Sequence, residues 1–227
     1  MTRLGSLTTG EVGERSGSTL LVPLGSIEQH GPHLPLDTDV VIAEAIAAGV
    51  MAAAADAFVL GPTIALGAAG EHEGFAGTLS IGTEALASML VELRRGLGPE
   101  FPVLAVVNAH GGNVEALRAA RDLSTAEGRE LRAWTVHVDG ADAHAGRTET
   151  SLMLAIAPDT VRTDRVEAGA TAPLRELVPE LRAGGVAGVS PNGVLGDPTG
   201  ASAEEGAEVL ADLIGAARRA LDPGMAP

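Results

Sequence analysis

The sequence predicts an α/β fold in which a mainly parallel β-sheet is covered by helices on both faces. Short apolar runs suited to buried strands alternate with longer segments whose apolar residues recur at helical spacing. Polar clusters follow three of the apolar runs. In parallel sheets, ligands bind at the carboxyl ends of the strands, which is where these clusters would lie. The 227 residues contain no linker-like run and no internal repeat, so we expect one domain over residues 1–227.

The expected strands are short and mostly apolar throughout, as strands buried on both faces are. They cover residues 19–24, 57–60 with 63–66, 101–107 and 131–138. Helical patterns cover residues 40–55, 83–97, 113–126 and 203–221. A possible capping box, Ser202 with Glu205, precedes the last of these helices.

The composition excludes several classes of function. The formal net charge is −15 and all 15 basic residues are arginine, which argues against nucleic acid or an anionic membrane as a partner. The absence of cysteine excludes disulfides, thiolate catalysis and cysteine-based zinc sites. The first residues lack the apolar core of a signal peptide, and no window approaches a membrane span, so we expect a soluble cytoplasmic protein.

The first polar cluster, S-I-E-Q-H-G-P-H-L-P-L-D-T-D, spans residues 26–39. Glu28 and His30 are two residues apart, so on extended backbone both side chains face one site. Carboxylate and imidazole groups are ligands of borderline divalent metals, and Asp39 lies at the start of the next helix. Alternatively, the segment is a surface loop whose acids cap that helix; we favour this role for Asp37 only.

The second cluster, N-A-H-G-G-N, follows the strand predicted over residues 101–107. His110 stands at the end of this strand, and the two glycines after it allow the backbone to approach a ligand closely. A histidine in an ordinary glycine turn is an equally simple explanation.

The third cluster, D-G-A-D-A-H-A-G-R-T-E-T-S, spans residues 139–151. His144 and Glu149 are candidates for a proton shuttle and a further metal ligand. Arg147 could bind a carboxylate or an anionic intermediate. A simpler explanation makes Glu149 a first-turn acid favoured by the helix dipole.

A fourth stretch, G-E-H-E-G-F-A-G-T from residue 70, contains Glu71 and His72 and is expected to shape one wall of the site. It fails the H-E-x-x-H pattern because Ala76 occupies the position of the second histidine. The sequence also lacks G-x-S-x-G, a Walker A motif and a helix-opening G-x-G-x-x-G. The remaining chemistry is that of a metal-dependent hydrolase.

Taken together, these motifs resemble the creatininase family of amidohydrolases. Two further stretches agree, F-A-G-T-L-S from residue 75 and G-V-L-G-D-P-T-G-A-S-A-E-E-G from residue 193, and the likeness covers about residues 20–215 in order. Within the family the sequence is most similar to the peptidases of the mycofactocin system, notably in G-E-H-E-G-F and L-P-L-D-T-D-V-V-I-A. The resemblance implies a three-layer α/β/α fold, two divalent metal ions per chain (zinc, iron or manganese) and a ring-like homo-oligomer, a hexamer or larger.

The resemblance also implies the metal ligands. Glu28, Asp39 and His110 would hold one ion, and His30 would hold the second, with Asp39 bridging the two. Creatininase itself reads N-G-H-Y-E-N in the second cluster, and its glutamate binds the second ion. That position is a glycine here, so the resemblance assigns the remaining ligand to Glu149.

The implied reaction is hydrolysis of an amide by a metal-activated water. His144 matches the family's catalytic histidine and would deliver a proton to the leaving nitrogen, oriented by Asp139 or Asp142. The implied substrate is a precursor peptide whose modified C-terminal Val-Tyr dipeptide is released. The alternatives are a small cyclic amide or formamide as substrate, or a metal-binding oligomeric scaffold without activity.

Overall fold

The computed structural model describes residues 1–222 and contains a four-stranded parallel sheet. The strands are β1 (Thr19–Leu24), β2 (Phe58–Leu60), β3 (Val103–Asn108) and β4 (Glu130–Thr135), in the order β2-β1-β3-β4. In the central pair Thr19 of β1 lies opposite Val103 of β3, and Leu24 lies opposite Asn108. The loops that follow β1 and β3 therefore start side by side.

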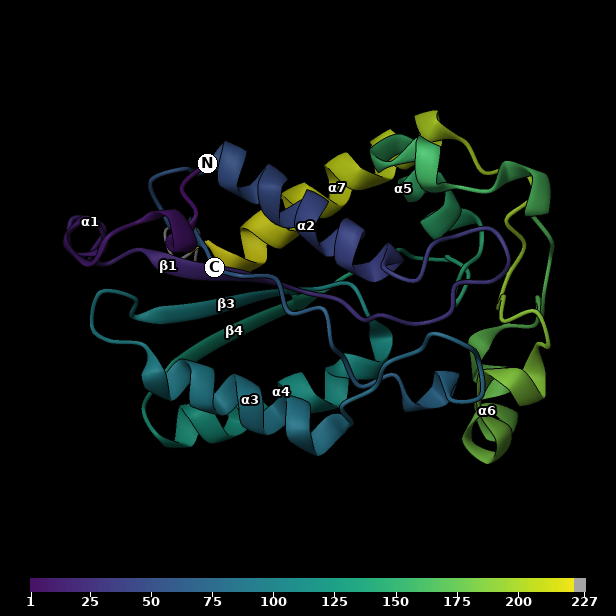
Figure 1. The fold of residues 1–227 in the computed structure, drawn as a ribbon, viewed down its shortest axis with the longest axis horizontal. Helices are drawn as coiled ribbons and strands as arrows, with labels where there is room; N and C mark the ends of the chain where they lie inside the picture. Colours follow the sequence, from purple (N-terminus) through teal and green to yellow (C-terminus); the bar gives the residue numbers. More distant parts are fainter. Residues whose placement is uncertain (223–227) are drawn as a thin grey trace.

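Helices cover both faces of this sheet (Figure 1). One layer contains α2 (Thr38–Ala53), α5 (Arg147–Ile156) and α7 (Ala203–Leu221), and the other contains α3 (Thr83–Gly96) and α4 (Val114–Ala126). The remaining helices are α1 (Thr9–Gly13), α6 (Leu174–Val189) and the short 3-10 turns η1 (Leu4–Ser6), η2 (Gly70–His72), η3 (Gly111–Asn113), η4 (Pro158–Thr160) and η5 (Thr163–Arg165). The predicted α/β/α fold class is confirmed.

Each face of the sheet forms its own hydrophobic core. Leu21 packs with Ile46 and Phe58 on the side of α2 and α7, whereas Leu20 and Leu24 pack on the side of α3 and α4. Successive residues of a strand point to opposite faces, and both faces are covered here. This explains why β1 reads as a continuous apolar run.

The differences from the predicted elements have local causes. β2 stops at Leu60, just before Gly61-Pro62, and the predicted second half of that strand contributes only an isolated bridge between Leu24 and Ile64. Asp37 occupies the N-cap position of α2 but its side chain makes no cap hydrogen bond, so its predicted capping role is wrong. Ser202 does cap α7, accepting a hydrogen bond from the Glu205 amide at 3.2 Å.

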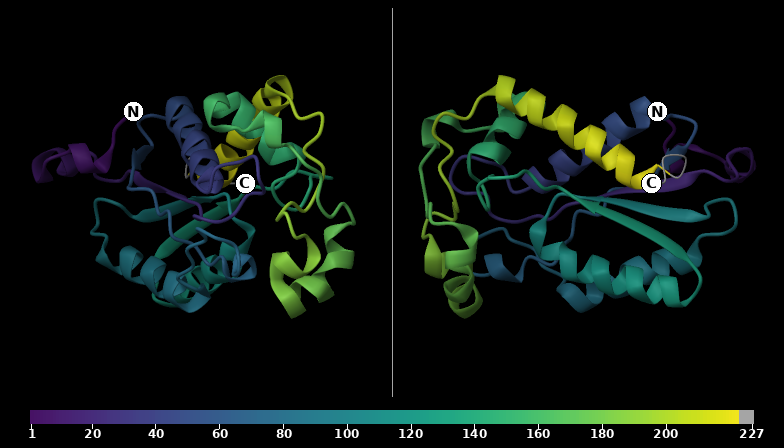
Figure 2. Two further views of the ribbon diagram at one scale, coloured as in Figure 1. Left: turned by 45° about the vertical axis from the view of Figure 1, so that its right-hand side comes forward. Right: turned by 180° about the vertical axis from the view of Figure 1, so that it is seen from behind.

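The sequence patterns did not predict α6, which lies beyond the carboxyl ends of the strands, apart from the two layers (Figure 2). It packs on η2 through a small hydrophobic cluster that includes Leu177, Val186 and Leu195. Gly185 interrupts it with a φ of 62°, a conformation that glycine adopts without steric cost. None of the helices in residues 1–222 is both long and apolar enough to cross a membrane.

Candidate metal centre

Four polar side chains from three segments of the chain meet at the carboxyl ends of β1 and β3. Glu28 and His30 come from the loop after β1, Asp39 from the first turn of α2, and His110 from the residues that follow β3. All four are at least 96% buried, an unusual environment for charged groups. The parallel register of β1 and β3 brings these loops together.

The first group of possible metal ligands consists of Glu28, Asp39 and His110. The Nδ1 atom of His110 lies 3.1 Å from Glu28 Oε2 and 3.2 Å from Asp39 Oδ2. One atom from each of the three residues can be chosen so that all lie within 4.8 Å of one another, close enough to surround a single ion.

The second group consists of His30, His144 and Glu149. His30 Nε2 lies 3.3 Å from Asp39 Oδ1 and 3.9 Å from Glu149 Oε2. Asp39 therefore presents one oxygen to the first group and the other to the second. This is the arrangement that a carboxylate bridging two ions requires.

Three buried carboxylate oxygens in the first group lack a hydrogen-bond partner among the described residues. They are both oxygens of Glu28 and Oδ2 of Asp39. These oxygens face imidazole nitrogens at 3.1 to 3.2 Å, and burying carboxylates is costly, so the group calls for a cation. Oxygen and imidazole nitrogen donors suit zinc, iron and manganese, so the residues present fit a divalent metal.

The pKa values of the cluster reflect the same concentration of negative charge. Burial raises the pKa of Glu28, as does the neighbouring charge of Asp39, and burial raises the pKa of Glu149 to about 7. Burial alone would lower the pKa of His30, but the charges of Asp39 and Glu149 outweigh it and raise the value to about 9. The pKa of His110 is raised for the same reason, with Asp39 and Glu28 outweighing burial. The cluster thus favours positive charge at its centre.

His144 lies inside the cluster rather than at its edge. Its Nε2–H donates to the backbone oxygen of Gln29 at 2.8 Å, which leaves Nδ1 facing Glu28 Oε1 at 3.8 Å. Burial and the nearby His30 and His72 lower the pKa of His144, so its imidazole is neutral. Backbone bonds to Leu195, in the G-V-L-G-D stretch, hold the His144 segment in place.

The two acids expected to orient His144 lie elsewhere. Asp139 is exposed and pairs with His137 at 3.0 Å on the surface. Asp142 accepts hydrogen bonds from the backbone amides of Arg147 and Asp197 and so braces two loops. The backbone carbonyl of Gln29 contacts the imidazole instead.

Gln29 is a site residue that the motif analysis missed. Its Oε1 accepts from the Gly31 amide at 2.9 Å, and its Nε2 lies 2.8 Å from His72 Nδ1 and 3.0 Å from the Gly193 oxygen. In the sequence, its position between Glu28 and His30 was the one indication of a role in the site. Side chains alternate on extended backbone, so that of Gln29 was expected to point away from those two residues.

His72 was expected to shape a wall, and the structure places it in the cluster. Its Nε2 lies 3.1 Å from Glu28 Oε1, and with Glu28 and His144 it forms a third group of possible ligands. Burial, together with the charge of His110, lowers the pKa of His72 to about 3, so this imidazole is also neutral.

Comparisons with known proteins agree with this geometry. Residues 5–221 match the family model described as "Creatininase: Creatinine amidohydrolase". The chain belongs to the creatininase family. It is 54% identical over 199 residues to the mycofactocin precursor peptide peptidase of Mycolicibacterium smegmatis, with 86% of this chain and 81% of the relative covered. It is 51% identical over 219 residues to that of Mycobacterium ulcerans, with 90% and 88% covered.

A solved structure described as "Creatininase Mn" superimposes with a TM-score of 0.79 at 25% identity. The match covers 100% of this chain and 99% of that one. The resemblance predicted from the motifs is therefore confirmed at the level of family and fold.

The structure explains why this member of the creatininase family has glycine at position 112. A Cβ atom there would lie 2.4 Å from the Ala68 oxygen, 2.4 Å from His110 Nε2 and 2.5 Å from Glu71 Oε1. No side chain fits without displacing one of these groups. Glu149 of α5 supplies a carboxylate on the other side of His30, with Oε2 3.9 Å from His30 Nε2.

Hydrogen bonds hold Glu149 and its neighbour Thr150 in place. Its Oε2 accepts from the backbone amide of Ala145 at 2.6 Å, so the first-turn role considered from the sequence is partly correct. The neighbouring Thr150 hydroxyl lies 2.8 Å from Nε2 of buried His33, which ties the loop after β1 to α5. His33 is a second buried contributor that the motif analysis did not single out.

Arg147 has a structural partner instead of an open anion site. Its guanidinium contacts both carboxylate oxygens of Glu205, at 3.0 and 2.8 Å, and joins the first turns of α5 and α7. The carboxylate that Arg147 binds in this structure belongs to the same chain, and a role toward substrate stays a prediction.

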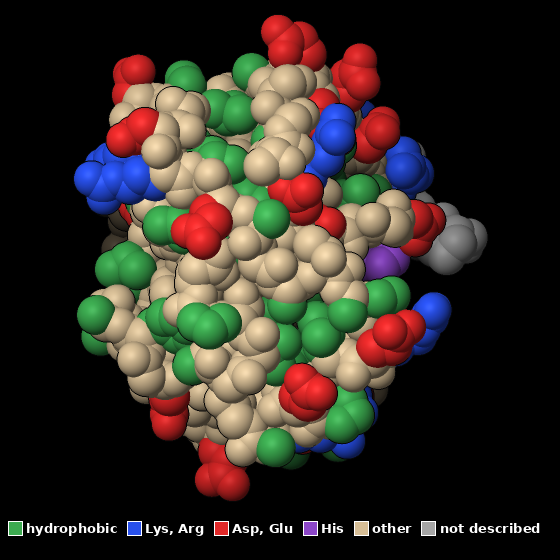
Figure 3. All heavy atoms as spheres, turned by 90° about the vertical axis from the view of Figure 1, so that its right-hand side faces the viewer, with side chains coloured by type: hydrophobic (Ala, Val, Ile, Leu, Met, Phe, Trp, Pro, Cys, Tyr) green, Lys and Arg blue, Asp and Glu red, His purple; other side chains and the backbone are tan. Residues whose placement is uncertain are grey.

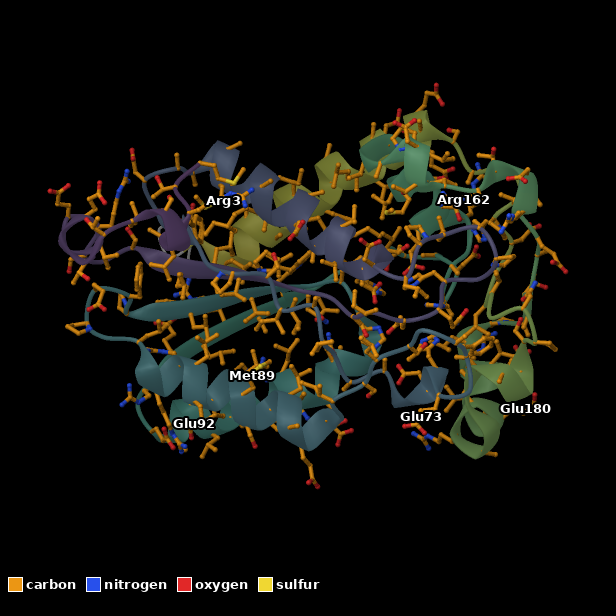
Figure 4. The ribbon with its side chains drawn as sticks, in the orientation of Figure 1. Arg3, Glu73, Met89, Glu92, Arg162 and Glu180 are labelled. Atoms are coloured by element: carbon orange, nitrogen blue, oxygen red, sulfur yellow. The ribbon has the colours of Figure 1, made fainter. Side chains whose placement is uncertain are left out.

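A cavity of about 800 Å³ is lined by Asp39, His110, His144 and Glu149. Glu71, expected to lie near the substrate, lines this cavity, with Oε1 3.6 Å from His110 Nε2. Side chains of α4 and α6 form the rest of the wall. Figure 4 shows Glu73 next to η2 and Glu180 on α6 at this end of the molecule, far from Met89 and Glu92 on α3.

Proposed function

We propose that this chain is a two-metal peptidase that releases the modified C-terminal Val-Tyr dipeptide from the mycofactocin precursor peptide. The substrate assignment is supported by the names of relatives that share half of its residues. The reaction class is supported by the buried carboxylate oxygens of Glu28 and Asp39 that lack a hydrogen bond, and by the cavity that Asp39 lines beside them.

In this proposal Glu28, Asp39 and His110 would hold one divalent ion. His30, Glu149 and Asp39 would hold the other. Two bound ions supply Lewis acidity toward the scissile carbonyl and make a water molecule more acidic. Zinc, iron and manganese all suit these donors.

His144 moves the proton in this proposal. Its neutral imidazole has Nε2–H committed to the Gln29 carbonyl, so Nδ1 is the atom free to accept a proton from water. The same atom would then donate that proton to the leaving nitrogen, which completes the transfer. Gln29 holds the ring in the orientation that this requires.

The decisive test compares Asp39→Asn with Asp37→Asn. Asp37 is exposed and its side chain has no capping bond, so it is a matched control two residues away in the same loop. Metal content per chain is measured by elemental mass spectrometry, and cleavage of the modified precursor peptide by liquid chromatography with mass detection. Wild type and Asp37→Asn are expected to hold about two ions and to cleave the peptide, whereas Asp39→Asn loses both properties.

Other outcomes separate the alternatives. Hydrolysis of creatinine or formamide without peptide cleavage would replace the peptidase assignment by a small-amide one. Bound metal without hydrolysis of any amide would favour a scaffold. His144→Ala is expected to keep both ions and lose turnover; loss of an ion would make His144 a ligand. Glu149→Gln is expected to keep only one ion.

We also propose a homo-oligomer, a hexamer or larger ring. Three leucines near the end of β1 support an interface, since Leu36, Leu66 and Leu79 are 38%, 42% and 52% exposed. Light scattering coupled to size-exclusion chromatography measures the assembly, and a monomeric mass at micromolar concentration would exclude it.

A further inference from the structure

The cavity extends beyond the metal centre to a region with a different character. One of its walls is a stripe of α6, with apolar residues at helical spacing that face a single side. This stripe consists of Leu174, Val178 and Leu181. Leu174 is 50% exposed, so the stripe is available to a bound molecule. A small cyclic amide at the metal centre would leave this region unused.

Two arginines line the same cavity, Arg118 from α4 and Arg182 from α6. Both are exposed, and neither makes a hydrogen bond or ion pair with any residue in the described range 1–222. Other arginines in this part of the chain, such as Arg95 and Arg147, are paired with carboxylates. The cavity therefore carries two positive groups without partners.

These two cations stand out against the charge of the whole protein. The formal net charge is −15. The end of the molecule that carries α6 shows hydrophobic side chains among scattered acidic ones, with arginines toward its edges (Figure 3). Glu71 and Glu115 also line the cavity and repel an anion. Away from the metal centre, Arg118 and Arg182 are the groups in the described lining of the cavity that attract an anionic ligand.

We infer that the α4–α6 side of the cavity binds an acidic segment of the peptide substrate, with carboxylates on Arg118 and Arg182 and apolar side chains on the α6 stripe. This inference rests on the proposed function, because it assigns the substrate segment outside the scissile bond. It makes the two arginines specificity determinants for peptides over small amides. Neither arginine touches the reacting atoms.

The experiment measures peptide binding to Arg118→Gln and Arg182→Gln. Arg121→Gln is the matched control, because Arg121 is exposed on the same helix as Arg118, pairs with Asp122 and lies outside this cavity. The probes are the fluorescein-labelled precursor peptide and the same peptide with every Asp and Glu replaced by its amide. Fluorescence anisotropy gives Kd, and cleavage assays give KM and kcat.

Each cavity variant is expected to raise the Kd and KM of the acidic peptide by up to about fivefold, with kcat unchanged, since exposed ion pairs contribute modestly. The control keeps the wild-type values. The amide peptide binds wild type more weakly, and its Kd does not change with either substitution. Added salt weakens binding of the acidic peptide to wild type more than to the variants.

Equal Kd values for the cavity variants and the control would overturn the inference. So would an equal loss of affinity for both peptides, because that indicates structural damage. Arginine-dependent binding without cleavage would reject the proposed function and keep the acidic-peptide site. Cleavage of the peptide with a Kd that does not depend on the arginines would keep the proposed function and reject the acidic-peptide site.

Discussion

Replacing Gly112 with alanine tests how tightly the metal centre is packed. The added Cβ would lie 2.4 Å from both the Ala68 oxygen and His110 Nε2, about 1 Å short of an ordinary contact. The Ala68 backbone cannot yield easily, because its amide donates to buried Asn113 at 2.8 Å. Glu71 is partly exposed and can swing away. The His110 ring is therefore the group that must move.

A shift of this size exceeds what metal coordination allows, since ligand distances hold to about 0.2 Å. We expect the affinity of the Glu28, Asp39 and His110 group for metal to fall at least 10–100-fold, as when ligand support is lost. Overpacking is expected to destabilise the fold by about 1–3 kcal/mol.

Gly111→Ala is the matched control, because a Cβ at Gly111 meets no atom within 4 Å. Metal affinity is measured by titration against a competing chelator, and stability by thermal unfolding. The control is expected to behave as wild type. If Gly112→Ala retained the metal affinity of Gly111→Ala, the packing argument would be refuted.

Three further predictions concern pH and stability. A metal ion that binds His30 must displace its proton, because the pKa of this imidazole is about 9. The apparent Kd for metal should therefore fall about tenfold per pH unit from pH 6 to 8 for each proton released. A Kd that does not change with pH would contradict this. Asn113→Ala removes three buried hydrogen bonds and should cost about 2–4 kcal/mol in urea unfolding, and a loss under about 1 kcal/mol would show that the bonds are replaced. Gly206→Ala places a Cβ 1.8 Å from the Ser151 oxygen and should lower Tm by about 2–12 °C. Gly215→Ala on the same helix is the control, because its Cβ meets only the end of a flexible arginine and should not lower Tm. Equal Tm values for Gly206→Ala and Gly215→Ala would disprove close packing of α5 on α7.

The periodicity of the chain was enough to predict the layered fold. β1 and α7 have the predicted bounds, because a continuous apolar run and a stripe of apolar residues at helical spacing each leave one way to bury the segment. The pattern did not predict α6, because Pro179 and three glycines, including Gly185, weaken a helical reading. Its place in the molecule depends on contacts with η2, which is distant in sequence.

The motifs identified most of the polar residues in the cluster, because carboxylates and imidazoles are the side chains that suit divalent metals. Glu28 and His30 were predicted to face one site, and the structure brings Asp39, His110 and Glu149 to them. The spacing could not show that Asp139 pairs with His137, or that Arg147 is neutralised by Glu205, because both partnerships depend on loop paths.

The sequence by itself determined the chemistry available to this protein: carboxylates and imidazoles, no thiol, and a parallel sheet to carry them. Only the tertiary structure decided which atoms meet. The register of β1 and β3 turns two loops toward each other, and burial then leaves three carboxylate oxygens without a hydrogen bond. That outcome depends on the distance and solvent exclusion between residues far apart in the chain, which local patterns do not record.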